Sequence, residues 1–151
     1  MDKTNKITIT CEDWETRMDI TRAVADILGI YMLDVDDYVI YGSVMNGDIE
    51  NHSKDEFIQK YGKSVFMALE TITYIAYVDT VEEPFVISLG YDTNDGNVDT
   101  FKKTISVNVS DNPKDIYSLI SDYTVKQRES ISATAEDIVD VITSDKRWKN
   151  L

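Results

Sequence analysis

The sequence predicts an α+β fold in which an antiparallel sheet of about four to five strands carries three to four helices packed mainly on one face. Three observations lead to this prediction. Some short runs alternate apolar and polar residues or are rich in β-branched residues, and other segments repeat apolar residues every three or four positions. Two β-prone runs also flank Asp95-Gly96, a pair typical of a turn between antiparallel strands. With 151 residues, the chain has the length of one ordinary domain, so we expect a single compact unit over residues 1–151.

The first elements are a strand and an amphipathic helix. Residues 6–10 alternate like a strand. Thr10 and Asp13 form a variant of the pattern that opens a helix, and apolar residues then recur at helical spacing until Gly29 supplies a stop. We therefore expect a strand followed by a helix that ends near residue 28.

The next third combines short β-prone runs with a second helix start. Residues 30–33 and 38–41 are β-prone and are separated by a polar segment, so they form two strands or one bent strand. Ser53 and Glu56 form a capping box, which opens a short helix that Gly62 ends or breaks.

The remaining segments complete the expected sheet and its helices. We expect a helix before residue 71 and an exposed strand from Thr71 to Val78, where β-branched and aromatic residues are frequent. Residues 85–91 and 104–109 should form the hairpin around Asp95-Gly96. Pro113 marks the start of one more helix, and a last helix carries Ile138.

The charge of the protein is large and unevenly distributed. The net charge is −13, and residues 1–100 contain 20 acidic against 7 basic residues, whereas residues 101–151 contain eight of each. Direct binding to nucleic acid or to anionic lipid is disfavoured, because both require positive potential at the contact surface. A basic partner protein is the better expectation, since a negative field attracts basic surfaces.

In bulk charge, the sequence resembles small acidic inhibitors made by phages and mobile elements against restriction or CRISPR nucleases, and immunity proteins that neutralise nuclease toxins. The resemblance implies a cytoplasmic, non-catalytic protein that mimics DNA and binds a nuclease or another nucleic-acid-binding protein, without a cofactor. From the charge distribution and the nearby tyrosines, we expect these contact residues: Asp34, Asp36, Asp37, Tyr38, Tyr41, Asp48, Glu50, Asp79, Glu82 and Glu83.

Two alternatives stay open. In the first, the protein is a structural or self-assembling module, such as a homodimer through the strand Thr71 to Val78, and its charge serves solubility. In the second, the protein is a metal-dependent phosphotransfer enzyme that uses Asp34 and Asp36. The β-prone run 30–33 followed by Asp34-Val35-Asp36 resembles the Asp-x-Asp loop of the haloacid dehalogenase family, which implies a nucleophilic carboxylate beside a magnesium ion.

Other candidate sites have little support. Asp34, Asp36 and Asp37 are of the residue type that magnesium or calcium prefers, so a plain cation site is an option. His52 is the only histidine and Cys11 the only cysteine, and we expect Cys11 to be a small packed residue. The sequence has no glycine-rich phosphate loop and no dinucleotide-binding pattern. The longest apolar runs are too short to span a bilayer, and a reducing compartment suits the single thiol.

Overall fold

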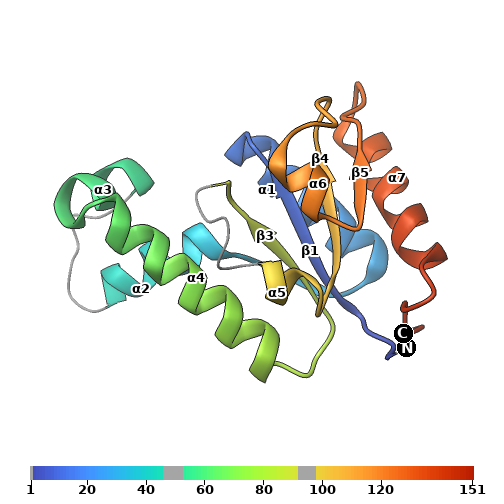
Figure 1. Ribbon diagram of the computed structural model, residues 1–151, viewed down its shortest axis with the longest axis horizontal. Helices are drawn as coiled ribbons and strands as arrows, with labels where there is room; N and C mark the ends of the chain where they lie inside the picture. Colours follow the sequence, from blue (N-terminus) through green and yellow to red (C-terminus); the bar gives the residue numbers. More distant parts are fainter. Residues whose placement is uncertain (1, 46–52, 92–97) are drawn as a thin grey trace.

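The computed structural model describes residues 2–45, 53–91 and 98–151, and its centre is a five-stranded sheet flanked by helices (Figure 1). In chain order, the elements are β1 (Lys6–Cys11), α1 (Trp14–Leu28), β2 (Tyr31–Asp34), α2 (Val35–Met45), α3 (Lys54–Tyr61), α4 (Lys63–Thr80), β3 (Phe85–Leu89), α5 (Val98–Phe101), β4 (Ile105–Val109), α6 (Ile116–Ile120), β5 (Tyr123–Val125) and α7 (Ile131–Ser144).

Every strand pair in the sheet is parallel, and the strand order is β2-β3-β1-β4-β5. The predicted antiparallel sheet is therefore wrong. The two runs expected to form a hairpin become β3 and β4, which lie on opposite sides of β1 and do not pair with each other. All five residues of β3 and all five of β4 are buried, as is usual for parallel strands covered on both faces.

Two predicted strands are helices in the structure. The segment 71–78 lies inside α4, so the exposed strand proposed for self-assembly does not exist. Phe66, Glu70, Tyr74 and Val78 are buried at a spacing of four residues, and this helical stripe overrides the β preference of the threonines and isoleucines between them. The run 38–41 likewise belongs to α2.

Helix α1 forms close to its predicted position, with two clear ends. Asp13 caps its beginning by accepting a hydrogen bond from the backbone N–H of Thr16, so the cap is Asp13 and not Thr10. Gly29 ends the helix in the left-handed conformation (φ 70°), which a residue without Cβ adopts at no steric cost. The chain then turns directly into β2.

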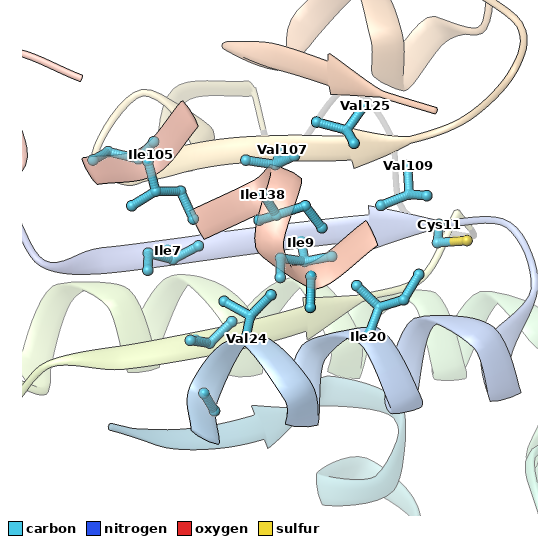
Figure 2. Close-up of a cluster of buried hydrophobic side chains, with 14 of the residues drawn as sticks. Ile7, Ile9, Cys11, Ile20, Val24, Ile105, Val107, Val109, Val125 and Ile138 are labelled. Atoms are coloured by element: carbon cyan, nitrogen blue, oxygen red, sulfur yellow. The ribbon is translucent and has the colours of Figure 1, made fainter. Parts of the chain in front are cut away.

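Helices cover both faces of the sheet, not mainly one as predicted. On one face, α1 and α7 pack on alternate residues of β1 and β4; Figure 2 shows Ile20 and Val24 of α1 and Ile138 of α7 against Ile7 and Ile9 of β1. The buried Cys11 belongs to this cluster, as expected for a packed thiol. A second cluster on the other face joins the sheet to the helices α2 to α6.

The end of the described chain docks on the body of the protein. Trp148 is 6% exposed and packs into the cluster under α7. Its neighbours bond to Thr4: the Thr4 N–H donates to the carbonyl of Arg147, and the Lys149 N–H donates to the carbonyl of Thr4. Among the helices that the structure describes, none combines the length and the apolar character needed to cross a bilayer.

Candidate functional site

The carboxyl ends of β1, β2 and β3 meet at the edge of the sheet where a ligand is expected. Strands β2 and β3 lie on one side of β1, and strands β4 and β5 lie on its other side. The winding direction of the chain therefore reverses at β1. In open α/β sheets, ligands bind outside the carboxyl ends of the strands at such a reversal. The groups at these strand ends therefore define the first place to look for a site.

A buried arginine links these strand ends. The side chain of Arg17, in the first turns of α1, is 2% exposed. Its Nε donates to the hydroxyl of Ser88 on β3 (2.8 Å), and one Nη donates to the carbonyl of Cys11 on β1 (3.3 Å). The other Nη donates to Asp34 (3.3 Å) and Asp36 (3.2 Å). One guanidinium thus joins three strands and is the cation that holds two buried carboxylates together.

Asp34, the last residue of β2, has both carboxylate oxygens engaged. Its Oδ1 accepts hydrogen bonds from Arg17 and from the hydroxyl of Ser88 (2.7 Å). Its Oδ2 accepts from the backbone N–H of Asp37 (2.9 Å) and from the indole N–H of Trp14 (3.2 Å). These bonds disfavour the nucleophilic role that the haloacid dehalogenase resemblance implies for one of the two acids, because both oxygens of the buried Asp34 carboxylate already accept two hydrogen bonds each.

Asp36, in the first turn of α2, differs from Asp34 in one respect. Its Oδ2 accepts from Arg17 and lies 3.5 Å from the Nζ of Lys54. Its Oδ1 is buried and has no hydrogen-bond partner among residues 2–45, 53–91 and 98–151. A buried carboxylate oxygen without a donor costs free energy, so this atom is a candidate contact for a ligand.

Asp36 lines a cavity of about 390 Å³ whose wall also contains Trp14, Asp37, Ile40, Ser53, Lys54 and Asp55. The wall combines the start of α1, the start of α2 and the capped start of α3, so it lies at the carboxyl end of β2. A larger cavity of about 580 Å³ is lined by Asn5, Tyr31 and Pro84, which precede or begin β1, β2 and β3. That cavity is at the opposite, amino end of the sheet, where this kind of fold does not place its ligands.

Asp37 is the carboxylate of the wall whose protonation is perturbed. Partial burial raises the pKa of its side chain above the usual value, and repulsion from Asp34 and Asp36 raises it further, whereas Arg17 and Arg22 act in the opposite direction. The ionised form of Asp37 is therefore disfavoured in the folded protein. A positively charged ligand would relieve this repulsion.

The perturbation of Asp37 predicts a pH-dependent gain in stability. Because the folded pKa is raised, ionisation of Asp37 destabilises the fold once the pH exceeds the ordinary value, and the full cost is present at neutral pH. We expect Asp37→Asn to raise Tm at pH 7 by about 1–2 °C, and this gain should vanish below about pH 4. Thermal unfolding followed by circular dichroism measures both values. Glu82→Gln is the control for the loss of one surface charge, and an equal gain in it would contradict the local explanation.

The segment between β1 and α1 is chemically unsuited to phosphate. In phosphate-binding loops at this position, glycines bring backbone N–H groups to the phosphates and a lysine supplies charge. Residues 11–18 contain no glycine and no lysine, three of them are acidic, and their single cation, Arg17, is buried against Asp34 and Asp36. Asp13 already occupies the helix start as its cap. This segment therefore repels anions.

The structure brings together only part of the predicted contact residues. Asp34 and Asp36 are buried in the Arg17 network, while Asp37, Tyr38 and Tyr41 are exposed on α2. Asp79, Glu82 and Glu83 are exposed at and beyond the end of α4, where Asp79 pairs with Lys103 (2.8 Å). Asp48, Glu50 and His52, and the turn around Asp95, lie outside the described residues.

Three residues of the site were not predicted from the sequence: Arg17, Trp14 and Lys54. Arg17 had a readable signal, because it lies three and four positions before the apolar-stripe residues Ile20 and Thr21 and thus on the buried face of α1. Trp14 is 44% exposed, so it lines the cavity instead of the core. Lys54 gave no signal, since its nearness to Asp36 depends on how α3 docks.

The option of a magnesium or calcium site at Asp34, Asp36 and Asp37 finds no geometric support. Among the described residues, no three acidic, cysteine or histidine side chains come together in a way that could hold a metal. The guanidinium of Arg17 lies between Asp34 and Asp36 instead.

Comparison with known proteins places this fold among kinases. No protein-family model matches the chain, and no curated protein matches it at the sequence level. Among solved structures, the chain is similar to shikimate kinase from Acinetobacter baumannii in complex with shikimate, with a TM-score of 0.76, 16% identity and coverage of 93% of this chain and 94% of that one. Shikimate kinase from Aquifex aeolicus has a TM-score of 0.72 and 18% identity, with coverage of 91% of this chain and 96% of that one. Dephospho-CoA kinase from Campylobacter jejuni has a TM-score of 0.54 and 10% identity, with coverage of 92% of this chain and 96% of that one.

These matches contradict the predicted non-catalytic inhibitor. The structural neighbours are enzymes, so the prediction that the protein is not an enzyme is withdrawn. We also withdraw the predictions of a DNA mimic with an anti-CRISPR or anti-restriction role and of a basic nucleic-acid-handling partner. The overall acidity did not indicate the fold, because charge constrains association and solubility but not fold. The phosphotransfer alternative agrees better with these neighbours. The chain has the α/β fold of shikimate kinases, with a five-stranded parallel sheet between two helical layers.

Proposed function

We propose that this protein is a phosphotransfer-type enzyme of the kinase fold that holds a small polar substrate in the cavity beside Asp36. One observation carries the proposal: Asp36 lines a cavity at the carboxyl edge of the sheet, and its buried Oδ1 has no donor among the described residues. A hydroxyl or ammonium group of a substrate would supply that donor. We also propose that the protein works in the cytoplasm, where the thiol of Cys11 stays reduced.

Phosphoryl transfer is the reaction class that the solved neighbours favour, because those named above are kinases. In such a reaction, a carboxylate next to the substrate hydroxyl accepts its proton while the hydroxyl oxygen attacks the terminal phosphorus of a nucleoside triphosphate, and the nucleoside diphosphate leaves. We assign this position to Asp36. Asp34 is the positioning residue, since it holds Arg17, Trp14 and the start of α2 in place.

The chain offers fewer groups for binding the phosphate donor than for binding the substrate. The acidic segment 11–18 carries neither glycine nor lysine, so we expect weak binding of Mg·ATP and substrate binding that does not depend on nucleotide. Titration of the protein with Mg·ATP, followed by the indole fluorescence of Trp14 in a Trp148→Phe background, tests this expectation. Tight, saturable nucleotide binding would show that phosphates are held by groups other than those considered.

The proposed activity is tested with two measurements on the same preparation. Indole N–H signals in ¹⁵N NMR spectra report which neutral, anionic and amine-bearing sugars reach Trp14, and ³¹P NMR then follows transfer from nucleoside triphosphates to the bound compound. We expect Asp36→Asn to lower the transfer rate by about 10²-fold or more, while the control Asp79→Asn keeps the parent rate. Normal transfer by Asp36→Asn would remove Asp36 from the reaction, and transfer no faster than without protein would rule out phosphotransfer.

A further inference from the structure

The wall of the Asp36 cavity has an excess of negative charge. Among the described residues, Asp36, Asp37 and Asp55 line the cavity, and Lys54 is the one basic residue of its wall. Arg17 does not change this balance for a ligand, because its side chain is 2% exposed and its donors already bond to Asp34, Asp36, Ser88 and the Cys11 carbonyl. An anionic ligand would therefore meet three carboxylates and no free guanidinium.

Lys54 is itself held at the edge of the wall. Its Nζ lies 3.5 Å from Oδ2 of Asp36 and 5.3 Å from the centre of the Phe66 ring, and its side chain is one third exposed. The lysine thus neutralises one oxygen of Asp36 and leaves Oδ1 to another donor. The side chain of Asp36 is 2% exposed, so a donor that bonds to Oδ1 does so away from bulk water, where a hydrogen bond to a carboxylate contributes more.

Trp14 gives the wall a flat aromatic surface next to these carboxylates. Its indole N–H is fixed on Asp34, which orients the ring, and 44% of the residue remains exposed. An aromatic face attracts cations and also stacks on the apolar face of sugars. Glu12, Asp13 and Glu15 surround Trp14 in sequence and extend the negative potential beyond the cavity.

We infer that the Asp36 cavity selects small molecules that carry a protonated amine beside hydroxyl groups, of which amino sugars are the simplest examples. The ammonium group lies against Asp37, Asp55 and the Trp14 ring, while a hydroxyl of the same molecule is left to Asp36. Ser53 is on the same wall and can bond to a further hydroxyl. This inference rests on the proposed function and names the substrate class of that same site.

Three sugars of nearly equal size separate charge from shape: glucosamine, glucose and glucuronate, at equal ionic strength and at about pH 6, where the amine is protonated and the carboxylate ionised. The probe is the Trp14 indole N–H signal, assigned with Trp14→Phe. We expect glucosamine to bind about tenfold more tightly than glucose, and glucuronate to bind more weakly than either. Glucose or glucuronate binding as tightly as glucosamine would overturn the inference and leave the proposed function intact.

Matched variants locate the effect. Asp37→Asn combined with Asp55→Asn removes two exposed charges of the wall and should reduce the preference for glucosamine over glucose to about twofold. Glu82→Gln combined with Glu83→Gln removes the same charge elsewhere and should leave the preference unchanged. An unaltered preference in the first double variant would contradict the inference. If none of the three sugars moved the Trp14 signal, the inference would fail, whereas the proposed function would still be decided by the ³¹P NMR measurement of transfer.

Discussion

Asparagine in place of Asp34 is expected to lower the free energy of unfolding by about 2–4 kcal/mol, whereas the same change at Asp36 should alter it by less than about 1 kcal/mol. Asp34 accepts four hydrogen bonds, two at each oxygen. An amide has only one acceptor oxygen, so its NH₂ group would face two donors whichever way it turns. At Asp36, the amide oxygen can keep the bond to Arg17, and the NH₂ group takes the place of the unpartnered oxygen.

Urea unfolding followed by circular dichroism measures both variants, with Asp79→Asn as the exposed control. The pair of results separates the two acids of the Asp-x-Asp motif by role: one carboxylate builds the site and the other is kept for a ligand. Equal destabilisation by the two substitutions would show that Asp36 is as important for stability as Asp34, and it would contradict the proposed role of Asp36 in ligand binding.

Methionine in place of Arg17 is expected to destabilise the protein by about 3–5 kcal/mol. The substitution keeps much of the side-chain volume but leaves Asp34 and Asp36 buried without their shared cation, and it removes the donor to Ser88. Lysine at the same position should cost less, although one ammonium cannot reach all the partners of the guanidinium fork. Urea unfolding again provides the measurement.

Arg22→Met is the matched control for Arg17→Met, because Arg22 is an exposed arginine of the same helix. It should change stability by less than about 0.5 kcal/mol. Combining Arg17→Met with Asp36→Asn should be less destabilising than the sum of the two, since the second change removes one of the carboxylates that the first leaves unpaired. Simple additivity would argue that Arg17 and Asp36 do not interact.

The sequence predicted most helices but not the sheet. Helices α1 and α3 follow from a local start signal with apolar residues at helical spacing behind it, and α7 follows from its apolar residues alone; these are properties of a short segment. Pairing between strands is not local. The runs that become β3 and β4 were assigned to a hairpin because Asp95-Gly96 lies between them, whereas β1, far away in the chain, inserts between them. Only the β3 run, FVISL, has the nearly continuous apolar sequence of a parallel strand that is covered on both faces, whereas the β4 run, ISVNV, alternates.

The site was predicted in part for the same reason. The Asp-x-Asp cluster after a β-prone run was visible, and the structure does place both acids at a strand end. The partners that decide what these acids do come from α1, β3 and α3, and their approach depends on the fold as a whole. A count of charges could not distinguish Asp34, which accepts four hydrogen bonds, from Asp36, whose Oδ1 has no donor among the described residues.

The shared guanidinium also constrains any attempt to build a glycine-rich phosphate-binding loop into this protein. A glycine-rich loop with a lysine, built across residues 11–18, would delete Arg17 and leave Asp34 and Asp36 as adjacent buried anions. Such a graft should fold only if one of these acids is neutralised at the same time. The loop 11–18 and the acid pair Asp34 and Asp36 therefore depend on each other. An evolutionary change from the present loop to a glycine-rich one would have to alter both together.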